Sequence, residues 1–151
     1  MRARDYQRSR CYAAERKARE LLGSKNRSFE TVQDIQNELE NFKSRKEFLE
    51  QFKDCQIRVK DGRGRRRPCC EIYSILSVMI PNFTLKFPKW SRNALTVMHE
   101  LTHTQIAVDL PWHGATFCQK LLQLIELYMG KEARDVLQQC YDEYSVRYDT
   151  E

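Results

Sequence analysis

This chain of 151 residues has no apolar run near the ~18 residues that a membrane-spanning helix needs. Its N-terminus is rich in arginine and lacks the apolar segment of a secretory signal peptide. Internal repeats and low-complexity tracts are also missing. We therefore expect one globular domain over residues 1–151, located in the cytoplasm and making no contact with a membrane.

The six cysteines are scattered, and no two of them form a C-x-x-C pair. Zinc ribbons and related structural sites need such pairs, so a zinc site of that type is not expected. Without a secretory signal, the cysteines are predicted to be reduced thiols, most of them buried.

Histidine is scarce too, and its three residues all fall in one short window. His99, Glu100 and His103 form an H-E-x-x-H motif, and His113 follows shortly after it. On a helix, His99 and His103 lie at i and i+4 on one face, where both can reach one Zn²⁺ beside Glu100. A catalytic zinc keeps a fourth position for water and lowers its pKa toward ~7. Glu100 is therefore predicted to be the general base that takes the proton of that water.

The sequence offers two candidates for the third metal ligand. His113 is favoured because imidazole suits zinc and because Pro111 interrupts the helix, which lets the chain turn back toward the metal. Asp109 is the alternative, since it lies six residues after His103, a spacing at which some H-E-x-x-H enzymes place their third ligand. If His113 is the ligand, Asp109 is expected to orient a histidine N–H instead.

Hydrophobic periodicity predicts an α+β domain. The first helix is expected over about 5–22, with Cys11, Ala14, Ala18 and Leu21 on its apolar face. A second helix is expected from about Ser28 to Phe42. The other helices are expected after a capping box at Ser44 and Glu47, after an N-cap at Ser91 that opens the motif helix, and on either side of Gly130.

Strands are predicted at 57–60, at roughly 70–80 and at 83–87. The tight turn at 61–64 predicts that the first two strands form a hairpin. The loop of this hairpin carries Arg63, Arg65, Arg66 and Arg67. These arginines are either a solvated turn or an anion contact, to nucleic-acid phosphates or to an acidic substrate. We favour the solvated turn, because no aromatic residues are interleaved with them as single-strand binders require.

The segments H-E-L-T-H at 99–103 and W-H-G-A-T-F at 112–117 resemble the core of SprT-like zinc metalloproteases. The whole chain is similar to a family of small metallohydrolases from actinobacteria and their phages. That similarity runs from R-D-Y-Q-R-S-R-C-Y-A-A-E at 4–15 through D-G-R-G at 61–64 to M-G-K-E-A at 129–133. The resemblance implies a zincin-like domain in which the three histidines hold zinc and Glu100 is catalytic.

The leading hypothesis is a zinc-dependent metalloendopeptidase that acts on a peptide or protein, with strand 83–87 holding the substrate by β-augmentation. A non-peptide amide is the nearest alternative substrate. A different class of function is a nucleic-acid-associated protein with a structural or vestigial zinc site, which would use the arginine loop and the basic N-terminus. Glu100 favours the enzyme, because a structural site needs no carboxylate beside its first ligand.

Overall fold

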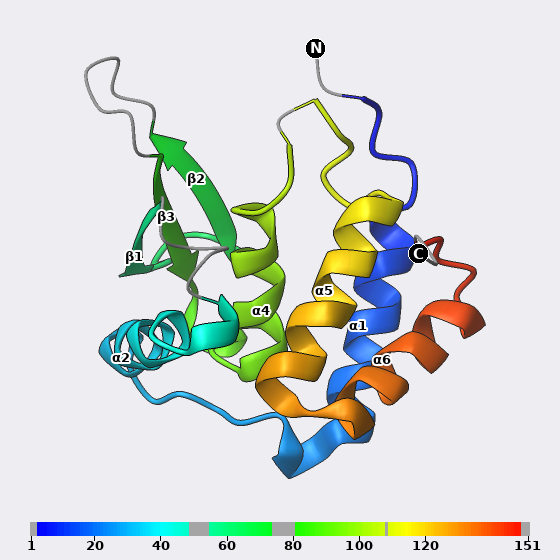
Figure 1. Cartoon of the computed structure of the whole chain (residues 1–151), viewed down its shortest axis with the longest axis horizontal. Coiled ribbons are helices and arrows are strands. Elements are labelled where there is room, and N and C mark those ends of the chain that lie inside the picture. The colour runs from blue at the N-terminus through cyan, green and yellow to red at the C-terminus, as the bar shows by residue number, and fades with distance from the viewer. Residues whose placement is uncertain (1–2, 49–54, 74–80, 108, 149–151) are drawn as a thin grey trace. The chain divides into compact units, whose positions relative to one another are not determined.

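Helices and one small sheet make up the part of the chain that the computed structural model describes, which is residues 3–48, 55–73, 81–107 and 109–148 (Figure 1). The expected α+β class is confirmed. Close contacts divide the chain into two units, one of Met1–Arg27 with Gln105–Glu151 and the other of Ser28–Thr104. A single domain over residues 1–151 stays a prediction. No helix among the described residues is both long and apolar enough to cross a membrane.

The first unit consists mainly of helices α1 (Arg8–Leu22), α5 (Ala115–Met129) and α6 (Lys131–Glu143), and α6 contacts both of the others. Gly130 separates α5 from α6 with φ +100°, a conformation that a residue without Cβ adopts at least cost. The expected apolar face of α1 needs one correction. Leu21 is 59% exposed and Leu22 is buried instead, because a turn of 3.6 residues carries the buried face from Ala18 to Leu22.

In the second unit, strands β1 (Gln56–Asp61), β2 (Cys69–Tyr73) and β3 (Asn82–Phe87) form a sheet in the order β1-β3-β2. Strand β3 runs parallel to β1 and antiparallel to β2. The predicted β1–β2 hairpin is therefore wrong. The most apolar strand takes the central place, and Phe83, Leu85 and Phe87 of β3 are all buried. The predicted continuation of β2 to residue 80 lies outside the described residues.

The same topology overturns another expectation. Both edges of β3 pair with neighbouring strands, so the segment 83–87 cannot take up a substrate peptide by β-augmentation. The outer edge of β1 is occupied as well, by the side chain of Gln36. Its amide donates to the carbonyl of Ile57 at 3.2 Å and accepts from the N–H of Val59 at 2.8 Å. In the described sheet, no strand pairs with the outer edge of β2 either.

Helix α2 (Val32–Lys43) begins later than predicted, after Thr31. Thr31 and Asp34 form a reciprocal capping box, in which each side chain accepts from the other residue's backbone N–H at 3.1 Å. Ser28 instead forms an isolated bridge with Asn93. The predicted capping box at Ser44 is also wrong, because Ser44 ends α2 and its hydroxyl donates to the carbonyl of Asn41.

Helix α4 (Ala94–His103) carries the H-E-x-x-H motif, and its residues 94–102 are all buried. Its N-cap is Asn93, whose side-chain oxygen accepts from the N–H of Thr96 at 3.0 Å. The predicted N-cap, Ser91, lies in the short 3₁₀ turn η2 (Lys89–Ser91) and donates to the carbonyl of Pro88. Helix α4 contacts strand β2, so the motif is held against the sheet.

Candidate metal centre

Helix α4 places His99 and His103 one turn apart, as the motif predicts. Their ring centroids are 5.1 Å apart, and their planes are inclined by 71°. His99 is buried, and His103 is partly buried. The packing of this helix fixes the backbone from which both imidazoles project, so their spacing is set before any ion binds.

Glu100 is buried beside the first histidine, with Oε1 3.9 Å from Nε2 of His99. Its negative charge also reaches the start of strand β2. Burial raises the pKa of the Cys70 thiol to about 12, and the carboxylate of Glu100 adds to that rise. Burial also raises the pKa of Cys69, and Glu100 contributes there to a smaller extent. The carboxylate of Glu100 therefore lies within electrostatic reach of strand β2.

His113 lies in the turn before α5 and is buried. Its Nδ1 is 2.7 Å from Oδ2 of Asp5, and the rings of Tyr12 and Phe117 pack edge-on against it, each at 5.1 Å between centroids. A carboxylate that accepts from Nδ1–H fixes the tautomer of the ring and leaves Nε2 with its lone pair. This arrangement is typical of a histidine that binds a metal through Nε2.

The backbone of His113 is held by Gln7, which is 1% exposed. The side-chain amide of Gln7 donates to the carbonyls of His113 at 2.8 Å and Arg147 at 3.0 Å, and its oxygen accepts from the N–H of Arg147 at 2.9 Å. The thiols of Cys11 and Cys118 lie 3.4 Å apart next to the same His113 carbonyl. One buried amide thus ties the turn of His113 to the segment after α6.

The three histidines form a cluster that could hold a metal ion. One ring nitrogen from each of His99, His103 and His113 lies within 4.8 Å of the others. The donor set consists of three imidazoles, and a carboxylate lies against one of them. Such a set suits zinc and other divalent first-row metals. The residues present therefore fit the expected ion, whose identity stays a prediction.

The two aspartates of this region differ from expectation. Among the described residues, the group that could hold a metal does not include Asp109, whose side chain is exposed and whose carbonyl accepts from the N–H of Ala3 at 3.1 Å. The carboxylate that orients a histidine is Asp5. Asp5 belongs to the R-D-Y-Q segment of the resemblance, but no metal-ligand motif in the sequence points to it.

The remaining predicted site residues, Arg63, Arg65, Arg66 and Arg67, are exposed in the loop that joins β1 to β2. Nothing places their side chains among the histidines.

Comparison of the chain with protein-family models, with curated proteins and with solved structures finds no match. The likeness to SprT-like metalloproteases therefore rests on the motifs quoted above.

Proposed function

We propose that the protein is a zinc-dependent hydrolase of the SprT-like type and that it cleaves peptide bonds in the cytoplasm. The observation that carries this proposal is the cluster of three histidine nitrogens, with the carboxylate of Glu100 beside the first of them. Zinc bound there supplies a Lewis acid and a water whose pKa lies near ~7. A structural metal site has no use for a buried carboxylate at that position.

In this proposal Glu100 takes the proton of the attacking water and passes it to the leaving amine. Its burial supports that role, because a carboxylate surrounded by protein is poorly solvated and interacts strongly with nearby charge. Glu100 stands next to His99 in the chain, so the helix that positions the ligand also positions the base.

Asp5 and Gln7 are proposed to position His113. Asp5 holds the ring in the tautomer that presents Nε2, and Gln7 fixes the carbonyl of the same residue. Neither side chain has to touch the substrate. Their effect is to hold the third ligand ready, so that little ordering is needed when the ion binds.

The outer edge of β2 is proposed to hold the substrate as an added strand. Three observations support this choice over the other strands: β3 is central, the amide of Gln36 occupies the outer edge of β1, and the charge of Glu100 reaches Cys70 on β2. A peptide paired along β2 would pass within reach of Glu100, and main-chain pairing would accept many side-chain sequences.

The test combines metal analysis of the purified protein with profiling on a peptide library. We expect about one zinc per chain and cleavage that disappears in Glu100→Gln, while the zinc content of that variant stays unchanged. Glu143→Gln, an exposed substitution on α6, is the matched control and should cleave like the wild type. Protein that carries zinc but cleaves no peptide would overturn peptidase activity. Cleavage retained by Glu100→Gln would remove this residue as the base.

A further inference from the structure

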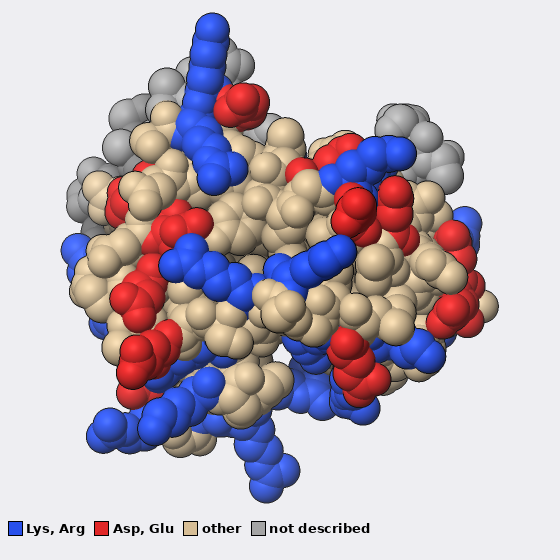
Figure 2. All heavy atoms as spheres, turned by 90° about the horizontal axis from the view of Figure 1, so that it is seen from below, with Lys and Arg blue, Asp and Glu red and all other residues tan. Residues whose placement is uncertain are grey.

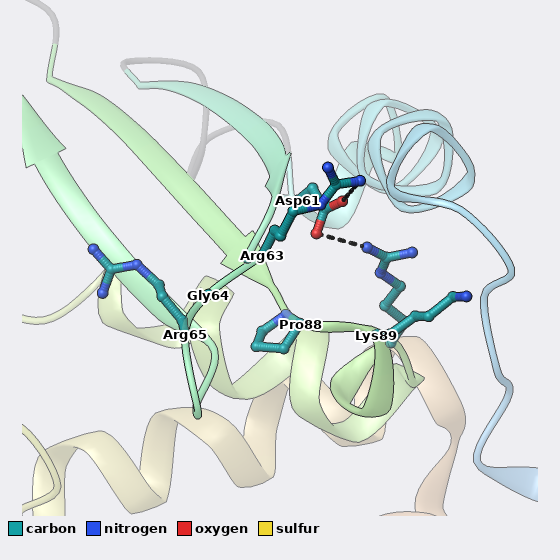
Figure 3. Close-up of a pocket in the computed structure, with 8 residues that line it drawn as sticks. Asp61, Arg63, Gly64, Arg65, Pro88 and Lys89 are labelled. Atoms are coloured by element: carbon teal, nitrogen blue, oxygen red, sulfur yellow. Dashed lines mark ion pairs between the residues drawn. The ribbon is translucent and has the colours of Figure 1, made fainter.

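A second site lies in the unit of Ser28–Thr104, where the β1–β2 loop meets the segment before α4. Two stretches, 61–71 and 86–92, contain seven basic residues and two acidic ones, an excess of five positive charges. They surround a pocket of about 370 Å³. Its lining residues are Asp61, Gly62, Arg63, Gly64, Arg65, Pro88, Lys89 and Arg92 (Figure 3).

The floor of this pocket is rigid. The N–H of Gly62 donates to the carbonyl of Phe87 at 3.1 Å, and a Cβ at position 62 would lie 2.6 Å from the ring of Pro88. Arg92 is nearly buried, with its guanidinium 3.1 Å from Oδ1 of Asp61 and its Nε donating to the same carbonyl of Phe87. These contacts fix the start of the loop and Arg92 against the sheet, so the base of the pocket does not depend on a ligand.

The cations around the pocket differ in their ion pairs. Arg65 is paired with Glu71 at 2.6 Å, and Arg92 takes up Asp61. The side chain of Arg63 is 92% exposed, and its Nη2 lies 4.0 Å from Oδ2 of the same Asp61, a longer distance than in the other two pairs. Among the described residues, no ion pair involves Arg66 or Lys89. Figure 3 shows Arg63 and Lys89 on one side of the pocket, while Arg65 points the other way.

This local excess differs from much of the surface. On the face shown in Figure 2, many Lys and Arg side chains stand beside Asp and Glu, the mixture expected of an ordinary solvated surface. We use the term basic patch for Arg63, Arg65, Arg66, Arg67, Lys89 and Arg92. Asp61 pairs with Arg63 and Arg92, and Glu71 is shared between Arg65 and Lys86, the latter at 3.0 Å.

An aromatic ring stands within the basic patch. Trp90 is 59% exposed, and its indole N–H donates to the carbonyl of Arg66 at 2.9 Å. The hydrogen bond fixes the edge of the indole against the arginine loop, and its exposed surface can accept a stacked group. The sequence separates Trp90 from Arg66 by 24 residues, so this aromatic neighbour of the arginine loop could not be seen as an interleaved residue.

We propose that the basic patch and Trp90 together bind single-stranded nucleic acid. Arg63, Arg66 and Lys89 contact phosphates, and a base stacks on the indole. Cations that follow a backbone beside an aromatic platform are the two elements of sequence-tolerant single-strand binding. An acidic peptide would use the cations but would leave the exposed indole without a role. The inference rests on the basic patch alone and holds whether or not the protein is a hydrolase.

The test measures the anisotropy of a labelled oligothymidylate titrated with the full chain over a range of salt concentrations. Arg63→Ala/Arg66→Ala/Lys89→Ala should lower the salt dependence of log K by about 0.7 unit per lost phosphate contact, roughly two units in all. Trp90→Ala should weaken binding about 5- to 100-fold without changing that slope, because the indole contacts no phosphate. Trp90→Phe, which keeps a stacking ring, should recover most of the affinity.

A charge-matched control is Arg16→Ala/Lys17→Ala/Lys131→Ala, which removes the same charge from exposed positions on α1 and α6. It should leave both affinity and slope near wild-type values. The proposal is overturned if the wild type does not bind the oligonucleotide, or if the control loses as much affinity as the patch variant. It is also overturned if Trp90→Ala binds like the wild type while polyglutamate competes fully, since that pattern identifies a surface for acidic peptides. Binding of inorganic phosphate without any binding of the oligonucleotide overturns it as well.

Discussion

Nδ1 of His113 lies 2.7 Å from Oδ2 of Asp5, although 108 positions separate the two residues in the chain. A carboxylate in this position raises the basicity of the ring and holds it in one tautomer. The segment before α1 therefore contributes directly to the candidate metal centre.

Asp5→Asn should weaken zinc affinity by about 10- to 100-fold while the fold is kept, because the amide preserves the shape of the carboxylate but not its charge. The measurement is a competition titration against a chelator. Asp109→Asn is the control and should bind zinc like the wild type, since its side chain is exposed. The reverse ranking of the two variants would return the orienting role to Asp109.

Gln7→Leu should lower the free energy of unfolding by about 2–4 kcal/mol. The change removes four side-chain hydrogen bonds, one of them to Sγ of Cys118, and leaves the carbonyls of His113 and Arg147 and one N–H without these partners. Urea denaturation measures the loss. Gln33→Leu, an exposed change on α2, should stay within about 0.5 kcal/mol of the wild type. Equal stability of the two variants would contradict the role assigned to Gln7.

The positions of the three strands could be predicted from sequence, but their partners could not. Alternation of apolar and polar residues is a local property, and it located β1 and β3 to within one residue at each end. Pairing depends on which strand buries the most surface. The turn at 61–64 suggested a hairpin, yet β3 enters between β1 and β2 because its buried side chains belong at the centre of the sheet.

The residues that begin the helices were also hard to predict from sequence, and substitutions at two candidate N-caps test the observed starts. Thr31→Ala should destabilise the protein by about 1 kcal/mol, because it removes the hydroxyl that accepts from the N–H of Asp34. Ser44→Ala should cost less than about 0.5 kcal/mol, since Ser44 caps no helix start. Thermal denaturation of the two variants decides between these helix starts. A larger loss in Ser44→Ala would restore the predicted capping box.

In metal-free protein, Cys70 should react with iodoacetamide more slowly at pH 8 than a thiol of ordinary pKa 9.0, because a pKa of about 12 leaves about 10³-fold less thiolate. The negative charge of Glu100 raises that pKa, so Glu100→Gln lowers it and should speed the reaction. Mass spectrometry of the alkylated peptide gives the rate. Glu143→Gln should leave the rate unchanged, and a rate that is the same in all three proteins would place Glu100 away from β2.

The candidate metal centre divides in the same way between local and distant information. His99, Glu100 and His103 could be found because a helical spacing fixes their relation within one turn. Asp5 could not, since it acts through His113, far along the chain, and the same holds in the basic patch for Trp90, whose partner is Arg66. Contacts between residues so far apart in the chain cannot be predicted from a local sequence pattern unless the fold is already known.

The hydrogen bonds of Gln7 to Arg147 span 140 positions, and they belong to a unit assembled from both ends of the chain. During synthesis this unit cannot close until Arg147 has left the ribosome, whereas the continuous stretch Ser28–Thr104 can form its contacts earlier. The histidines of α4 would then be in place before His113 has its buried amide and its carboxylate. Zinc binding should accordingly follow the folding of the stretch Ser28–Thr104 in a newly made chain.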